Sequence, residues 1–178
     1  MVLRDLEPDD LGAMIDAWTA ADVPGFMDDF GPRTRDEVEE WLPAAIAARD
    51  TNPHYGGCAI VERSSGHVVG WIGWGGSNER HRDIGDIDFA YVVAPGFRGR
   101  GYASDALRVV VDFCFSELGV SSVWGRCHPD NIASRRVMEN AGLQAIGEVD
   151  GEPAFRATDA TWAAVDRRTI AHDEERAP

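Results

Sequence analysis

One stretch of the sequence constrains the fold more than any other: an alternating strand that runs into a glycine-rich turn and then into a helix. Residues 84–93 place different side chains on two faces, which is typical of a β-strand. Glycines follow at 99 and 101, beside two arginines, and a helix is predicted over 101–118. The first amides of a helix have no intrahelical partner and carry partial positive charge, so this turn predicts an anion site. A tight turn without a ligand is the alternative.

The rest of the chain supplies strands and helices in an order that predicts an α+β fold. The spacing of apolar side chains places strands at 2–4, 57–62, 67–74, 84–93, 121–127, 143–149 and 155–165, and helices at 11–18, 34–46, 101–118 and 131–141. We therefore expect a mixed sheet of about seven strands with helices on both faces. Residues 1–170 are expected to form one domain, followed by a flexible tail over 171–178.

The charge balance excludes several functions. The chain has 178 residues with 31 acidic and 17 basic side chains, a formal net charge of −14, and every basic residue is Arg. Without Lys, the chain can form neither a Walker A phosphate loop nor a Schiff-base site. So acidic a chain is a poor nucleic-acid binder, and no nucleic-acid partner is expected. The charge is unevenly spread, because residues 1–90 carry a net −11 whereas residues 98–136 carry a net +2.

The sequence also suggests a compartment. No apolar run approaches the roughly 18 residues of a membrane span, and the charged N-terminus does not resemble a signal peptide, so no membrane partner is expected. Cys58, Cys114 and Cys127 are odd in number and widely spaced, which favours reduced thiols in a cytoplasm over a disulfide framework. The 5 histidines lack ligand spacing with Cys or carboxylates, so no metal site is expected.

Two motifs point to a family. Arg98, Gly101 and Ala103 fit the pattern Gln/Arg-x-x-Gly-x-Gly/Ala, the acetyl-CoA motif of the GNAT superfamily of N-acetyltransferases, which the chain resembles. A second stretch, residues 129–143, resembles the Asn-x-x-Ser helix of the RimJ/RimL-like branch of that superfamily, with Leu143 in place of the usual Phe. The resemblance extends more weakly over residues 2–165. It implies a mostly antiparallel sheet with a splayed parallel pair of strands at the acetyl-CoA site.

The resemblance implies acetyl-CoA as a cosubstrate and a set of residues that bind it. Free backbone groups of residues 91–93 would hold the pantetheine arm, and an amide near Val93 would polarise the thioester carbonyl. Asn131 would bond to the cofactor, cap its own helix, or do both. Either Arg135 or Arg136 could meet the 3′-phosphate, or both could lie on a solvated helix face. The implied cofactor-binding residues are Tyr91, Val92, Val93, Arg98, Gly99, Arg100, Gly101, Tyr102, Ala103, Asn131 and Arg136.

The family's chemistry is direct attack of an amine on the thioester, which implies a base and, in many members, an acid. Asp88 lies three residues before Tyr91, where many members carry a Glu base, and its shorter side chain calls for a bridging water. A strand-face carboxylate paired with an Arg is the alternative. Met138 stands where many members have a Tyr that protonates the departing thiolate, so Ser134 is the candidate acid. Alternatively, Ser134 bonds to its own helix backbone, or the thiolate leaves unassisted.

The acceptor is expected to be a primary amine. Between the first two helices lie Phe26, Asp28, Asp29 and Phe30, which are expected to bind a cation against aromatic walls, or simply to pack the loop. A protein or peptide N-terminus, as in ribosomal-protein acetylation, and a cationic small molecule such as a polyamine or an aminoglycoside both stay open, as does a homodimer. A non-catalytic acyl-CoA-binding module that kept the fold is the rival function.

Overall fold

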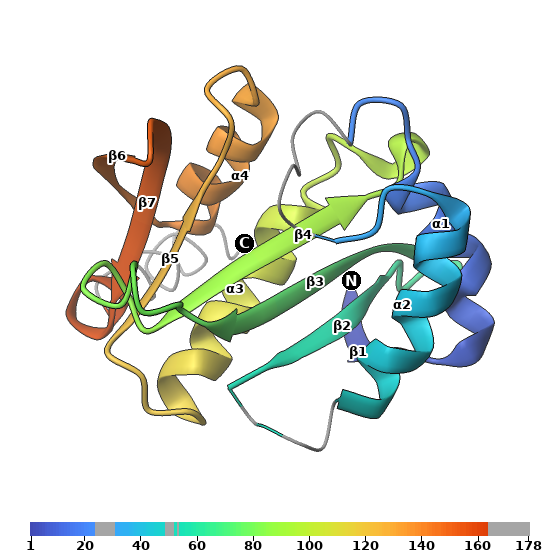
Figure 1. The fold of residues 1–178 in the computed structure, drawn as a ribbon, viewed down its shortest axis with the longest axis horizontal. Helices are drawn as coiled ribbons and strands as arrows, with labels where there is room; N and C mark the ends of the chain where they lie inside the picture. Colours follow the sequence, from blue (N-terminus) through green and yellow to red (C-terminus); the bar gives the residue numbers. More distant parts are fainter. Residues whose placement is uncertain (24–30, 49–51, 53, 164–178) are drawn as a thin grey trace, which may run out of the picture.

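The computed structural model describes residues 1–23, 31–48, 52 and 54–163. Within them seven strands form one sheet in the order β1-β2-β3-β4-β5-β7-β6 (Figure 1). Neighbouring strands are antiparallel except β4 and β5, which are parallel. This confirms the predicted α+β fold with a mostly antiparallel sheet. The strands are β1 (Val2–Asp5), β2 (Gly56–Val61), β3 (Val68–Gly76), β4 (Ile87–Val93), β5 (Ser122–Arg126), β6 (Gln144–Val149) and β7 (Glu152–Thr158).

Helices cover both faces of the sheet (Figure 1). Helices α1 (Leu11–Trp18) and α2 (Arg35–Ala48) lie on one face, and α3 (Tyr102–Ser116) lies on the other, where α4 (Ile132–Ala141) packs against α3, β6 and β7. The described residues also include two short 3-10 helices, η1 (Pro8–Asp10) and η2 (Pro95–Phe97). The α1/α2 side packs around Trp18, Trp41 and Trp71, whose ring centroids are 5.4 to 5.8 Å apart. The α3/α4 side packs around the apolar stripe of α3, formed by Ala106, Leu107, Val110, Val111 and Cys114.

The parallel strands β4 and β5 separate after their first residues. Their paired register covers only Ile87 with Val123 and Asp88 with Trp124, although β4 runs on to Val93. Beyond these pairs the facing edges of the two strands do not pair with each other. Because unpaired backbone amides and carbonyls must find other partners, this split in the sheet is suited to a ligand that binds main chain.

Two predicted element bounds are wrong. The last strand is β7 (Glu152–Thr158) rather than 155–165, and residues 159–163 are helical. Thr158 ends the strand, because its Oγ1 accepts from the amide of Thr161 at 3.3 Å and its own amide donates to Thr161 Oγ1 at 2.9 Å. The strand predicted over 84–93 begins at Ile87, since Ile84 is in a turn that its amide closes on the His81 carbonyl at 2.9 Å. The predicted tail, 171–178, lies outside the described residues.

In residues 1–23, 31–48, 52 and 54–163 there is no helix with the length and apolar character needed to cross a bilayer. In the same ranges, His, Cys, Asp and Glu side chains form no group of three or more with a geometry that could hold a metal ion.

Candidate active site

The split between β4 and β5 opens into a cavity of about 890 Å³. Its walls come from β4, the turn before α3, β5 and the start of α4, so segments from across the sequence meet there. Both candidate catalytic residues, Asp88 and Ser134, line this cavity. The predicted cofactor-binding residues that line it are Tyr91, Val92, Val93, Arg98, Gly99, Gly101, Tyr102, Ala103, Asn131 and Arg136.

The turn before α3 has the backbone conformation expected of an anion cradle. Gly99 and Gly101 have φ angles of 73° and 87°, in the left-handed region that favours glycine. A Cβ built on Gly99 meets nothing within 4 Å, and one built on Gly101 meets only the Asp105 carboxylate at 3.9 Å. Since protein atoms do not crowd these glycines, the conformation holds open space beside the first amides of α3. That space and those amides fit a phosphate group.

The two arginines of the turn point in different directions. Arg98 lines the cavity, where its Nε donates to the Val93 carbonyl at 2.8 Å and its guanidinium pairs with Asp22. Arg100 does not line the cavity in the part of the chain that the structure describes. Its guanidinium lies over the Phe97 ring at 5.4 Å and donates to the Gly96 carbonyl at 3.0 Å. Of the two arginines, Arg98 lines the cavity and Arg100 does not, and cofactor binding by either stays a prediction.

The start of α4 faces the same cavity. Asn131 caps the helix, because its side-chain oxygen accepts from the amide of Ser134 at 2.9 Å. This confirms the capping role, and its position on the cavity wall leaves a cofactor contact available as well. Of the two arginines proposed for the 3′-phosphate, Arg136 is exposed and lines the cavity, whereas Arg135 is half-buried.

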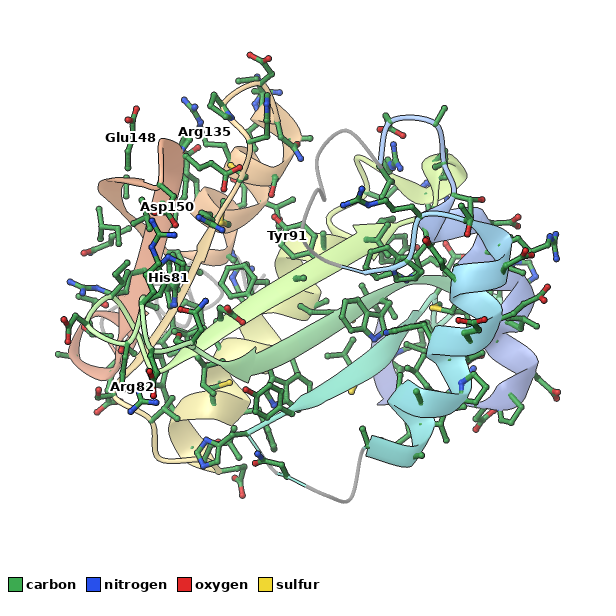
Figure 2. The ribbon with its side chains drawn as sticks, in the orientation of Figure 1. His81, Arg82, Tyr91, Arg135, Glu148 and Asp150 are labelled. Carbon is green, nitrogen blue, oxygen red and sulfur yellow. The ribbon has the colours of Figure 1, made fainter. Side chains whose placement is uncertain are left out.

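Ser134 is bonded across the split rather than along its helix. Its Oγ lies 2.7 Å from the phenol oxygen of Tyr91, and that phenol oxygen also lies 3.2 Å from the carbonyl oxygen of Ser134. In Figure 2 Tyr91 lies between β4 and α4. The phenol therefore ties the two walls of the cavity together on the α3/α4 side.

Asp88 lies on the same strand as Tyr91, β4, but on the opposite face of the sheet. It pairs across the sheet with Gly75 on β3 and with Trp124 on β5. Burial raises the pKa of Asp88 to about 6, and the positive charge of His81 and Arg126 opposes that rise. A carboxylate with this pKa is mostly ionised at pH 7 and is a stronger base than an ordinary Asp.

Sequence reasoning missed the charged network beside Asp88. His81, which is buried, bonds through Nε2 to the Asp150 carboxylate at 2.8 Å (Figure 2). The same carboxylate accepts from Arg126 at 2.7 Å and from Arg80 at 3.0 Å, and Arg126 also pairs with Glu152 at 3.1 Å. His81, Arg126 and Glu152 all line the cavity. No local motif signals this network, because its members come from the β3–β4 loop, the end of β5, and the β6–β7 turn.

The predicted acceptor residues cannot be placed. Phe26, Asp28, Asp29 and Phe30 lie outside the described residues. At the Asp88 end, the cavity is instead lined by Asn78, His81, Trp124, Arg126 and Glu152.

Comparison with known proteins agrees with this architecture. The family profile for the acetyltransferase (GNAT) domain matches residues 1–144. The chain belongs to the GNAT acetyltransferase family. Its relatives include the N-acetyltransferase YnaD of Bacillus subtilis, 32% identical over 82 residues, and the FsC-acetyl coenzyme A-N(2)-transacetylase of Aspergillus fumigatus, 32% identical over 124 residues. The matches cover 46% and 65% of this chain, but only 44% and 50% of those relatives, so the chain spans about half of their length.

Solved GNAT structures share the fold. A GNAT acetyltransferase from Bacillus anthracis superposes with a TM-score of 0.72 at 19% identity, covering 89% of this chain and 94% of that one. An aminoglycoside acetyltransferase in complex with coenzyme A gives 0.69 at 18% identity over 93% and 98% of the two chains. A putative ribosomal-protein-serine acetyltransferase from Vibrio cholerae gives 0.66 at 19% identity over 88% and 92%. At these identities the likeness concerns the GNAT fold alone.

Proposed function

We propose that this GNAT protein transfers the acetyl group of acetyl-CoA to a primary amine by direct attack. The observation that carries the proposal is the single cavity in the β4–β5 split, which joins the glycine turn of α3 to the half-buried Asp88. The turn supplies amides and the Arg98 charge for the pyrophosphate, and the unpaired edges of β4 and β5 supply main-chain groups for the pantetheine arm. Free thiols at all three cysteines support a reducing, cytoplasmic setting.

The geometry separates the two proton transfers of the reaction. Asp88 lies on the α1/α2 face of the sheet and Ser134 on the α4 side, so the amine and the thiolate are served from opposite faces of the split. An aliphatic ammonium with a pKa near 10.4 costs about 4.6 kcal/mol to deprotonate at pH 7. Asp88 accepts that proton, directly or through water, and the Ser134 hydroxyl hydrogen-bonds to the departing sulfur.

We propose two acceptor classes within the RimJ/RimL-like branch of the GNAT superfamily. The N-terminus of a protein is supported by the Asn131-x-x-Ser134 helix and by the fold shared with the ribosomal-protein acetyltransferase named above. A cationic small molecule is supported by the acidic first half of the chain and by the fold shared with the aminoglycoside acetyltransferase. An α-amine with a pKa near 8 needs about 1.4 kcal/mol for deprotonation at pH 7, so weak base catalysis favours the first class.

A panel of amines tests the proposal. CoA release from acetyl-CoA is measured with N-terminal peptides, a polyamine and an aminoglycoside, for the wild type and for Asp88→Ala. We expect turnover on at least one acceptor that Asp88→Ala lowers by about 100-fold or more. Acetyl-CoA binding without turnover on any amine would contradict the proposal and favour a non-catalytic acyl-CoA-binding module. That alternative is supported by Met138, which stands where many family members have a Tyr that acts as the general acid.

A further inference from the structure

Tyr91 and Ser134 form a hydroxyl pair that closes the α4 side of the cavity. Both side chains line the cavity, and their oxygens are 2.7 Å apart. The Asn-x-x-Ser motif of the RimJ/RimL-like branch accounts for Ser134, but it gives no role to the side chain of Tyr91. Only the backbone of the strand that carries Tyr91 was expected to bind the cofactor. Ser134 lies on α4, the helix where Met138 stands in place of the tyrosine of many family members, and Met138 is buried in the core.

The direction of the hydrogen bond follows from what else each oxygen can do. The carbonyl of Ser134 belongs to the first turn of α4, where it accepts an intrahelical bond from four residues on. Its contact with the Tyr91 hydroxyl is also the longer of the two, at 3.2 Å. Of the two acceptors within reach of the phenol proton, Ser134 Oγ at 2.7 Å is the nearer and the one that accepts no bond within the helix, so we infer that the phenol donates to Ser134 Oγ. The hydroxyl proton of Ser134 is then available for the Cys127 thiol, with which Ser134 also hydrogen-bonds, or for a ligand in the cavity that both side chains line.

Tyr91 cannot itself be the acid. Burial raises the pKa of the Tyr91 phenol far above its ordinary range. A thiolate with an ordinary pKa near 8.5 is too weak a base to take that proton. Tyr91 stays protonated and acts as a fixed donor.

We propose that Tyr91 is a positioning residue, which holds the Ser134 hydroxyl as a hydrogen-bond donor toward the sulfur of bound CoA. Without the phenol, a serine in the first turn of a helix rotates to donate to a carbonyl three or four residues back, here Asn131 or Asp130. In that rotamer Ser134 gives nothing to the sulfur. No covalent step passes through Tyr91, and the proton released by the reaction leaves through Asp88 on the other face. This inference rests on the proposed role of Ser134.

A titration of bound CoA tests the inference without an acceptor. The thiolate absorbance of CoA bound to the protein gives the pKa of its thiol, after subtraction of the protein alone. The protein's own thiols interfere little, because burial raises the pKa of Cys58 to about 11 and of Cys114 to about 12, and also raises that of Cys127. A donor on the sulfur favours the thiolate, so its loss raises the pKa of bound CoA.

The expected results form a double-mutant cycle. Tyr91→Phe and Ser134→Ala each raise the pKa of bound CoA by about one, a tenfold change in thiolate stability, and lower kcat by a similar factor with KM for acetyl-CoA unchanged. The double variant is no worse than Ser134→Ala alone, since both changes remove one interaction. Ser134→Thr keeps a hydroxyl and restores most of the effect. Tyr55→Phe, which removes an exposed phenol bonded to the Gly76 carbonyl at 3.3 Å, is the matched control and stays at the wild-type value.

The possible failures are distinguishable. If Ser134→Ala changes both quantities and Tyr91→Phe changes neither, the positioning role of Tyr91 is wrong and the proposed function stands. If Ser134→Ala leaves both unchanged, Ser134 does not contact the sulfur, and both the proposed role and this inference fail. Additive effects of the two substitutions, together with lower thermal stability of Tyr91→Phe, would mean that the phenol only supports the fold.

Discussion

The two ends of the cavity are built from different parts of the protein. At the α3 end the ligand faces main chain, with two left-handed glycines, the first amides of a helix and the unpaired edges of β4 and β5. At the Asp88 end it faces charged and aromatic side chains that several segments contribute. Main-chain groups are present whichever side chains the sequence carries, so the α3 end suits a ligand that does not vary, such as the cofactor. The second end is set by charge and pKa, so substitutions there alter acceptor choice and pH dependence.

The largest expected effect falls at the Asp88 end. Asp88→Asn removes the base but keeps the size of the side chain, and we expect kcat to fall by about 10²- to 10³-fold. KM for acetyl-CoA is expected to stay within about twofold, because the glycine turn is untouched. The wild-type rate should rise with pH through about 6, where Asp88 loses its proton. This acidic limb of the pH–rate profile should vanish in the variant. An unchanged acidic limb would assign it to another group.

Stability serves as the control for that substitution. Burial raises the pKa of Asp88 above its unfolded value, so its contribution to stability is present below pH about 4 and is lost as pH rises through about 6. At pH 7 the folded protein therefore bears a penalty that Asn does not have. Because Asp88 is only partly buried, we expect a gain of about 1 kcal/mol, measured by denaturant unfolding at pH 5 and pH 8. Loss of activity together with a gain of stability rules out misfolding as the cause.

The next largest effect is expected from a substitution at the α3 end of the cavity, where the ligand faces main chain. Gly101→Ala forces an alanine to a φ of 87° at the start of α3, and its Cβ projects into the space beside the first amides. We expect the Kd for CoA, measured by calorimetry, to rise about tenfold or more, with the pH limb of Asp88 unchanged. Gly96→Ala is the matched control, since a Cβ there meets nothing within 4 Å and its φ is not in the left-handed region. Equal losses in both variants would contradict a phosphate cradle at Gly101.

The same contrast explains what the sequence could predict. The glycine turn, the cap at Asn131 and the faces of β4 depend on residues a few positions apart, so local pattern was sufficient. The contact between His81 and Asp150 joins residues 69 positions apart, and it forms only because strand order brings the β3–β4 loop to the β6–β7 turn. The error at 155–165 has a local cause of another kind, since the cap at Thr158 ends the strand although buried apolar side chains continue beyond it to Trp162.

Substitutions of the two arginines of the turn are expected to have smaller effects, and comparing them tests which arginine contacts the cofactor. Arg98→Ala removes the guanidinium on the cavity wall and its bond to the Val93 carbonyl, and we expect the Kd for CoA to rise about fivefold. Arg100→Ala removes a guanidinium that lies over Phe97, outside the cavity, and we expect less than a twofold change. Calorimetry at low and high salt checks the cause, because the loss at Arg98 should shrink with added salt. Equal effects of the two substitutions would show that Arg100 turns toward the cofactor when it binds.

The smallest effect concerns the charge around Asp88. Asp150 accepts from His81, Arg126 and Arg80 and offsets part of their positive charge, and hydrogen bonding from His81, with those charges, holds the pKa of Asp150 below its usual range. Asp150→Asn keeps a side chain that tolerates the φ of 52° at this position. With the negative charge gone, Arg126 acts more strongly on Asp88 and lowers its pKa, although Glu152 still offsets part of the Arg126 charge.

The acidic limb of the rate should then move to lower pH by roughly 0.3 to 0.5, a shift sized for partly screened charges. Asp83→Asn, in the exposed part of the β3–β4 loop, removes a similar charge and should leave the limb in place. A shift to higher pH in Asp150→Asn would mean that losing the Asp150 bond lets His81 move away from Asp88. In that case the network would tune the base by holding His81 in place, and the charge of Asp150 would matter less than its hydrogen bond.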